Sequence, residues 1–215
     1  MNPYAVLASA AAEWDALEPR LAPDARAELA ALLGRMREPG PGAADRAALA
    51  GRAAEVLAAQ LPDRFGPGRL APAPPGPDVT HLGFRADDLA VLLLDGHRMA
   101  GPVLGAVRDR LLAEPALDAD TVRRAGGDPY AAGLIRLRGA GGRLLLPAFQ
   151  FSEGALPWLT VLEVNAVLGA DGDPWGAADW WLGENAWLAA APARLLGTAD
   201  ERRLPATARH LIEGE

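Results

Sequence analysis

The first 65 residues carry apolar side chains at helical spacing, which predicts three amphipathic helices. The first spans about residues 3–17 and the third about residues 43–61. The second begins after Pro23 and ends before Pro39, because proline interrupts the hydrogen-bond ladder of a helix. Its apolar positions recur every three or four residues: Leu29, Leu32, Leu33 and Met36. Small-residue faces on these helices allow close packing, either within the chain or across a dimer, and we expect a homo-oligomer.

Residues 66–78, GPGRLAPAPPGPD, form the clearest break in this pattern. Proline at this density forbids helix and favours an extended, semi-rigid connector. We therefore predict a linker between a helical N-terminal region, residues 1–65, and a middle segment, residues 79–150. The middle segment begins with two further expected helices, at about residues 86–94 and 101–113.

The rest of the middle segment has the order of elements found in a winged helix-turn-helix. Asp118 is typical of an N-cap that opens a short helix, and the glycine pair at residues 126–127 predicts a turn. Asp128 followed by Pro129 is typical of a cap and a first helical residue, which predicts a second short helix. Apolar side chains and arginines alternate in residues 135–138, GAGG follows at residues 139–142, and a leucine run ends at residue 146. This pattern predicts a β-hairpin in the position of a wing.

The C-terminal part, residues 151–215, is again helical in its pattern. Four helices are expected, at about residues 156–168, 174–182, 193–196 and 199–212. Asp173 and Pro174 supply the N-cap and first residue of the second one. Pro205 lies near the middle of the last, where it should kink the helix or split it in two. The expected fold class is therefore mainly α, with one short β-hairpin.

Composition narrows the class of function. The chain has 215 residues, no cysteine and a formal net charge of −7 at pH 7. The absence of cysteine excludes disulfides and thiolate metal sites and suits a reducing cytoplasm. All basic residues are arginine, and alanine, glycine and proline abound, which favours a bacterial source. No stretch approaches the roughly 20 apolar residues of a membrane span.

The middle segment departs from the acidic balance of the whole chain. Residues 121–143 contain five arginines and a single acidic residue, whereas residues 144–215 contain four arginines and ten acidic residues. Five side chains are therefore candidates for contact with operator DNA: Arg123, Arg124, Arg136, Arg138 and Arg143. A solvated arginine face on a structural hairpin is the alternative, because the expected recognition helix contains little that reads bases.

Four of the six tryptophans lie between residues 171 and 197. Trp180 and Trp181 are adjacent, so they leave a helix about 100° apart and one narrow face cannot bury both. At least one of them should be partly exposed. The stretch is either a small core packed on tryptophan or a protein interface, where tryptophan is common among the residues that dominate binding.

Short motifs follow one another in the last third of the chain. They are PAFQF (147–151), a leucine-rich helix, DPWGAADWWL (173–182), an Asn-x-x-Leu step (185–188), Pro-x-x-Leu-Leu (192–196) and a terminal helix. This order resembles the toxin-binding C-terminal domain of Xre/MbcA/ParS-type antitoxins. The chain differs in having three alanines at residues 189–191, where family members usually carry a glycine.

The resemblance implies that the partner is a RES-domain toxin, a class of enzyme that consumes NAD. It also implies that the tryptophan stretch and the last helix bind it. The residues expected at that contact are Trp175, Trp180, Trp181, Trp187, Arg209, His210 and Glu213. Such a protein would block its toxin and bind DNA to repress its own promoter. The alternative is a stand-alone transcription regulator or assembly protein without a toxin.

The sequence offers little for catalysis. There is no cysteine nucleophile, and the two serines, Ser9 and Ser152, lie outside any G-x-S-x-G motif. The three histidines are scattered, and Asp171-Gly172-Asp173 is not followed by ligands at EF-hand spacing. We therefore expect a non-catalytic binding protein without metal or cofactor.

Overall fold

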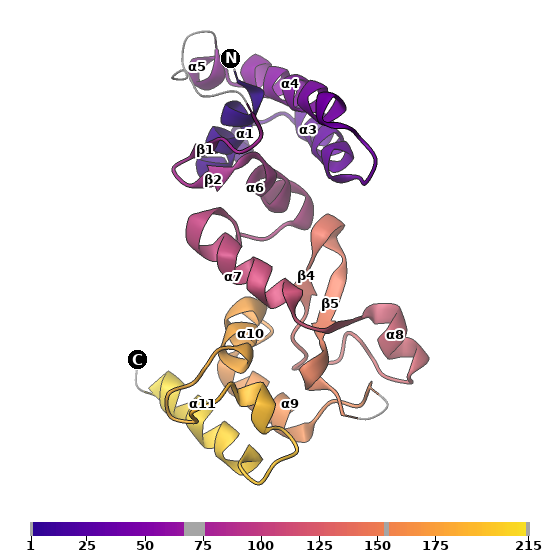
Figure 1. Ribbon diagram of the computed structural model, residues 1–215, viewed down its shortest axis with the longest axis vertical. Helices are drawn as coiled ribbons and strands as arrows, with labels where there is room; N and C mark the ends of the chain where they lie inside the picture. Colours follow the sequence, from indigo (N-terminus) through magenta and orange to yellow (C-terminus); the bar gives the residue numbers. More distant parts are fainter. Residues whose placement is uncertain (1, 67–75, 153–154, 214–215) are drawn as a thin grey trace. The chain divides into compact units, whose positions relative to one another are not determined.

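The computed structural model describes residues 2–66, 76–152 and 155–213 (Figure 1). Its described part is mainly helical with two small sheets, which confirms the expected fold class. The chain divides into two compact units. Unit 1 comprises residues 1–106 and 140–142, and unit 2 comprises residues 107–139 and 143–215.

Unit 1 is a helical assembly. Its helices are α1 (Pro3–Ala12), α2 (Trp14–Leu17), α3 (Pro23–Arg37), α4 (Ala43–Gln60), α5 (Pro62–Phe65) and α6 (Ala86–Ala90). The apolar positions predicted for α3 point into the core, where Leu29, Leu32 and Leu33 are buried, and Met36 packs against it. The alanine face of α4 is also buried there, so this small-residue face packs within the chain.

A short hairpin and a π-helical turn complete unit 1. Strands β1 (Thr80–His81) and β2 (Phe84–Arg85) pair antiparallel, and a π-helical turn over Val91–Asp95 continues α6. Both the hairpin and α6 pack against α1. The described residues after the expected linker therefore join the N-terminal helices in one unit, and the division falls at residues 106 and 107 instead. Most of that linker, residues 67–75, lies outside the described residues.

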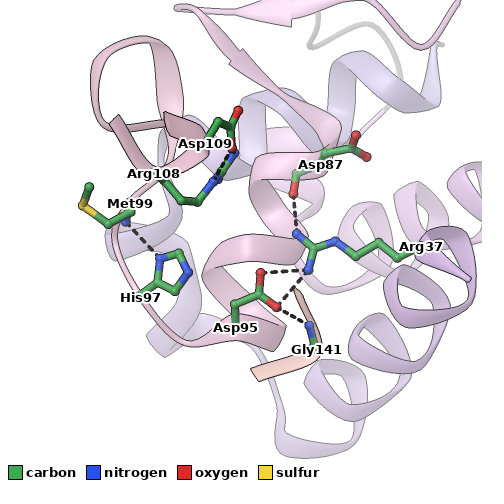
Figure 2. Close-up of polar contacts among 8 residues, drawn as sticks. All are labelled: Arg37, Asp87, Asp95, His97, Met99, Arg108, Asp109 and Gly141. Atoms are coloured by element: carbon green, nitrogen blue, oxygen red, sulfur yellow. Dashed lines mark hydrogen bonds and ion pairs between the residues drawn. The ribbon is translucent and has the colours of Figure 1, made fainter. Parts of the chain in front are cut away.

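A buried ion pair organises the end of α3 in unit 1 (Figure 2). Asp95 is almost fully buried, and both its carboxylate oxygens lie 2.9 Å from Nη1 of Arg37. The backbone N–H of Gly141 donates to the same carboxylate at 2.8 Å. Removing a charge from water is costly unless it is paired and hydrogen-bonded, and Asp95 is both.

Unit 2 begins in the second half of α7 (Gly101–Ala113) and contains a three-stranded antiparallel sheet. Its next elements are β3 (Ala116–Asp118), α8 (Ala119–Arg124), β4 (Leu137–Arg138) and β5 (Leu144–Pro147). The predicted hairpin forms from β4 and β5. The third strand, β3, pairs with the other edge of β5 and was not expected. The predicted winged helix-turn-helix would have one more helix between α8 and β4.

The second helix expected in this element does not form. Asp128 accepts a hydrogen bond from the backbone of Tyr130 at 2.9 Å, which closes a turn instead of capping a helix. Residues 129–130 and 132–133 are turns, and Gly133 has a positive φ of 77°. The helix-turn-helix is therefore incomplete, because the segment that would be its recognition helix is irregular.

The C-terminal helices form the core of unit 2 with the sheet. They are α9 (Leu159–Leu168), α10 (Pro174–Leu182) and α11 (Leu204–Glu213), with 3₁₀ turns at Pro192–Leu195 and Glu201–Arg203. The Asp173 side chain accepts from the N–H of Gly176, and Pro174 is the first residue of α10, as predicted. Pro205 is the second residue of α11, so the last predicted helix is split at this proline. No described helix combines the length and apolar character needed to cross a membrane.

Candidate partner-binding surface

The tryptophan stretch rests on a buried chain of hydrogen bonds. Trp181 is 0% exposed, and its indole Nε1 donates to Oδ1 of Asn165 on α9 at 2.7 Å. Asn165 in turn donates through Nδ2 to the carbonyl of Gly133 at 2.7 Å. Three segments that are distant in sequence are thereby tied together, and both polar groups of the Asn165 amide find partners inside the core.

Gln150, from the PAFQF motif, forms a second buried tether. Its Oε1 accepts from the N–H of Ile135 at 2.6 Å, and its Nε2 donates to the carbonyl of Ile135 at 3.0 Å. The side chain thus pairs with the backbone as a neighbouring strand would. Phe149 packs its ring on Trp181, with centroids 5.2 Å apart. The motif is structural: it fixes the entry to β4 and supports α10.

Trp180 and Trp175 are only partly buried. The Trp180 ring meets Trp181 edge-on, with centroids 5.1 Å apart and planes at 86°. The prediction that one of this adjacent pair is partly exposed is confirmed, and Trp180 is the one. Its Nε1 is buried and has no hydrogen-bond partner among the described residues. Trp175 packs at the margin of the same core.

The Asn-x-x-Leu step folds as a tight loop that turns Trp187 outward. Oδ1 of Asn185 accepts from the N–H of Trp187 at 3.0 Å and from that of Leu188 at 3.2 Å. Leu188 then points into the core, whereas Trp187 is 55% exposed. The Asn185 N–H closes the loop on the carbonyl of Ala190 at 3.2 Å.

The three alanines of this region include one with unusual backbone geometry. Ala189 has a φ of 53°, in the left-handed region that L-residues with a Cβ adopt at a cost. A glycine would adopt this conformation freely. Of the three alanines at residues 189–191, Ala189 is therefore the one whose backbone conformation favours glycine.

Trp187 is held against the C-terminal elements by contacts on two sides. Nη2 of Arg203 donates to the Trp187 carbonyl at 2.9 Å. The His210 ring on α11 meets the Trp187 indole edge-on, with centroids 5.1 Å apart and planes at 67°. An indole fixed through its backbone and flanked by a second ring loses little freedom when a partner covers it.

The other residues of α11 divide between an exposed face and a buried face. Arg209 forms an ion pair with Glu163 of α9, which joins the two helices on the surface. Ile212 and Glu213 are exposed at the end of α11. On the inner face of the helix, Leu204 and Ala208 are fully buried.

The predicted partner-binding residues therefore separate into core and surface. The prediction that Trp181 contacts a partner is wrong, because its side chain has no exposed area. Trp175 and Trp180 are mainly packing residues, and Arg209 is committed to Glu163. The structure brings Trp187 and His210 together on the surface, and Glu213 is exposed on the same helix. Arg203, which sequence reasoning missed, positions Trp187 through its backbone, a contact with no signal in the sequence.

The five arginines predicted to contact DNA are unequally available. Arg123 pairs with Asp120 at 2.7 Å and stacks on Tyr130, and Arg136 pairs with Asp171 at 3.0 Å. Arg124 donates to Thr121 Oγ1 at 3.0 Å. The side chains of Arg138 and Arg143 are exposed and make no hydrogen bond or ion pair with other described residues.

Asp118 is the N-cap of α8, as predicted, and its electrostatics follow from that position. The N–H of Thr121 donates to its carboxylate at 2.6 Å. This backbone hydrogen bond, with the Thr121 side chain and two nearby arginines, lowers the pKa of the Asp118 carboxyl. Among the described residues, no group of three or more histidines and carboxylates is arranged to hold a metal ion.

Comparison of the chain with protein-family models, with curated proteins and with solved structures finds no match.

Proposed function

We propose that this protein is a non-catalytic, antitoxin-like protein that binds and inhibits a RES-type, NAD-consuming toxin through unit 2. The observation that carries the proposal is the outward-facing Trp187, held by Arg203 and flanked by His210. The order of motifs in the last third of the chain supplies the class of partner. The two lines of support are independent, since one comes from sequence and the other from exposure.

The geometry at Trp187 suits an anchor for a protein partner. Tryptophan buries a large apolar area with only two side-chain torsions to fix, and it is enriched among the residues that dominate binding energy. The loop around it is already closed by Asn185 and tied to Arg203. Because the loop is already ordered, binding of a partner costs little conformational entropy at this side chain.

The test is co-expression with a RES-type toxin encoded beside the gene, read out as co-purification and as cellular NAD. We expect the unaltered chain to capture the toxin and preserve NAD. Trp187→Ala should weaken binding by about 2 kcal/mol, or roughly 30-fold, because it removes the central apolar anchor.

The matched control is Tyr130→Ala, which removes another exposed aromatic side chain of unit 2 outside the proposed surface. It should bind the toxin as the unaltered chain does. Equal neutralisation by Trp187→Ala and the unaltered chain, with both folded by thermal melt, would show that the surface is wrong. No adjacent RES-type reading frame and no capture would favour the alternative, a stand-alone regulator or assembly protein.

DNA binding for autoregulation is the second part of the proposal, and Arg138 and Arg143 are the residues that would carry it. Arg138 lies on β4 and Arg143 immediately precedes β5, and both side chains are exposed and make no hydrogen bond or ion pair with other described residues. The irregular segment at residues 129–133 offers no recognition helix, so we expect contact with phosphates to exceed contact with base edges.

A further inference from the structure

A pocket of about 900 Å³ lies in unit 1. Pockets that hold small molecules in proteins commonly measure about 300–1,000 Å³ and are mostly apolar with a few polar groups. Most of this lining is apolar and comes from the start of α1, the end of α3, the start of α4 and the stretch before β1. It includes Pro3, Tyr4, Met36, Ala43, Ala47 and Pro77.

Two of the polar side chains around the pocket already form hydrogen bonds within unit 1. Nη1 of Arg37 pairs with Asp95, and its Nη2 lies 3.4 Å from the carbonyl of Asp87 (Figure 2). Asn2 caps α1, with its Oδ1 accepting from the N–H of Tyr4 at 3.0 Å. These hydrogen bonds hold Asn2 and Arg37 in place at the pocket. The charge of Arg37 is balanced by the buried carboxylate of Asp95.

Two hydrogen-bond donors of the lining have no partner among the described residues. The guanidinium of Arg46, on the first turns of α4, makes no hydrogen bond or ion pair with any other described residue. The same holds, within the described chain, for the hydroxyl of Tyr4. A guanidinium offers five N–H donors in a planar fork that matches a carboxylate or another oxyanion.

We infer that this pocket binds a small amphipathic acid, with its apolar body against Tyr4, Met36 and Ala47 and its anionic group on Arg46. The carboxylate of Asp87 also lines the pocket and has no partner among the described residues. It disfavours a second negative charge, so the ligand is a monoanion. This site lies in unit 1 and does not depend on the proposed function of unit 2.

The test uses two fluorescent probes with the same ring system and the full chain. One is 1-anilinonaphthalene-8-sulfonate, and the other is N-phenyl-1-naphthylamine, which lacks the sulfonate. The sulfonate probe should bind saturably at one site. Arg46→Gln should weaken it about tenfold, because a charge-assisted hydrogen bond is lost, and should leave the neutral probe unaffected.

The matched control for charge is Arg52→Gln, an exposed arginine of the same helix that does not line this pocket. It should leave both probes unchanged, whereas Asp87→Asn should tighten the sulfonate probe. Ala47→Trp should fill the pocket and abolish binding of both probes, whereas the exposed neighbour Ala44→Trp should not.

Non-saturable binding, equal weakening by Arg46→Gln and Arg52→Gln, or equal effects of Ala47→Trp and Ala44→Trp would each overturn the assignment. The two glutamine variants decide the matter if Ala47→Trp fails to fold, because Arg46 and Arg52 are both exposed.

Discussion

At the scale of single residues, Asn165 connects more of unit 2 than any sequence signal indicates. It accepts from the buried Trp181 indole and donates to Gly133. Asn165→Leu keeps a similar volume but leaves both partners unpaired, so we expect the free energy of unfolding to fall by about 2–4 kcal/mol. Urea denaturation followed by circular dichroism measures it. Glu163→Gln, on the exposed face of α9, should cost less than about 1 kcal/mol. A loss below that in Asn165→Leu would contradict this role.

Ala189 gives a second prediction at the same scale, with the opposite sign. Its φ of 53° is strained for alanine, so Ala189→Gly should raise stability by roughly 0.5 kcal/mol, after the greater chain entropy of glycine is subtracted. Ala190 is the control, because its φ is not positive and Ala190→Gly should lower stability by a similar amount. Thermal melts of the two variants should therefore move in opposite directions.

The Asp118 cap predicts a pH effect. The pKa of its carboxyl is lowered in the folded chain, so the cap stabilises α8 at pH values above the ordinary pKa of aspartate. This contribution is lost as the pH falls through the lowered, folded-state pKa. In Asp118→Asn the corresponding part of the acid destabilisation should be absent. Carboxyl carbon resonances followed by NMR should show Asp118 titrating below the ordinary pKa of aspartate, and an ordinary value would contradict the cap.

At the scale of elements, α11 divides into a buried first part and an exposed last turn. Leu204 and Ala208 pack into the core, whereas His210 and Glu213 lie outside it. Truncation after Ala208 should therefore keep unit 2 folded, with a lower melting temperature from the lost Arg209 ion pair, and abolish toxin capture. His210→Ala, which keeps the helix, should reproduce part of the binding loss. Capture by the truncated chain would exclude α11 from the interface.

Some secondary-structure elements could be predicted from the sequence and others could not. Local signals succeeded: the Asp173–Pro174 start of α10 and the hairpin of β4 and β5 depend on neighbouring residues. Elements fixed by distant partners were missed. Strand β3 pairs with a strand more than 20 residues away, and the turns at residues 129–133 keep the Gly133 carbonyl available to Asn165. For the surface, the sequence identified the tryptophans, but the tertiary hydrogen bond of Trp181 decides which one is buried.

At the scale of the whole molecule, charge limits any binding to DNA. The chain carries −7 overall, and three of the five candidate arginines already have partners within unit 2. If a promoter fragment from its own locus binds, Arg138→Ala with Arg143→Ala should reduce the salt slope by about two, since each lost phosphate contact releases about 0.9 fewer counterions. Arg52→Ala is the control. An unchanged slope in the double variant would exclude the hairpin of β4 and β5 from DNA contact.

Because Trp187 faces outward, its fluorescence should reveal whether a partner covers this surface. All six tryptophans lie among the described residues, and Trp187 is the one with most of its surface in water. Collisional quenchers such as iodide should therefore reach it preferentially, and its emission should lie at the red end of the protein's spectrum. A partner that covers the indole would shift that emission to the blue and shield it from iodide. Binding at this surface can thus be followed by light emitted from the chain itself, without any attached label.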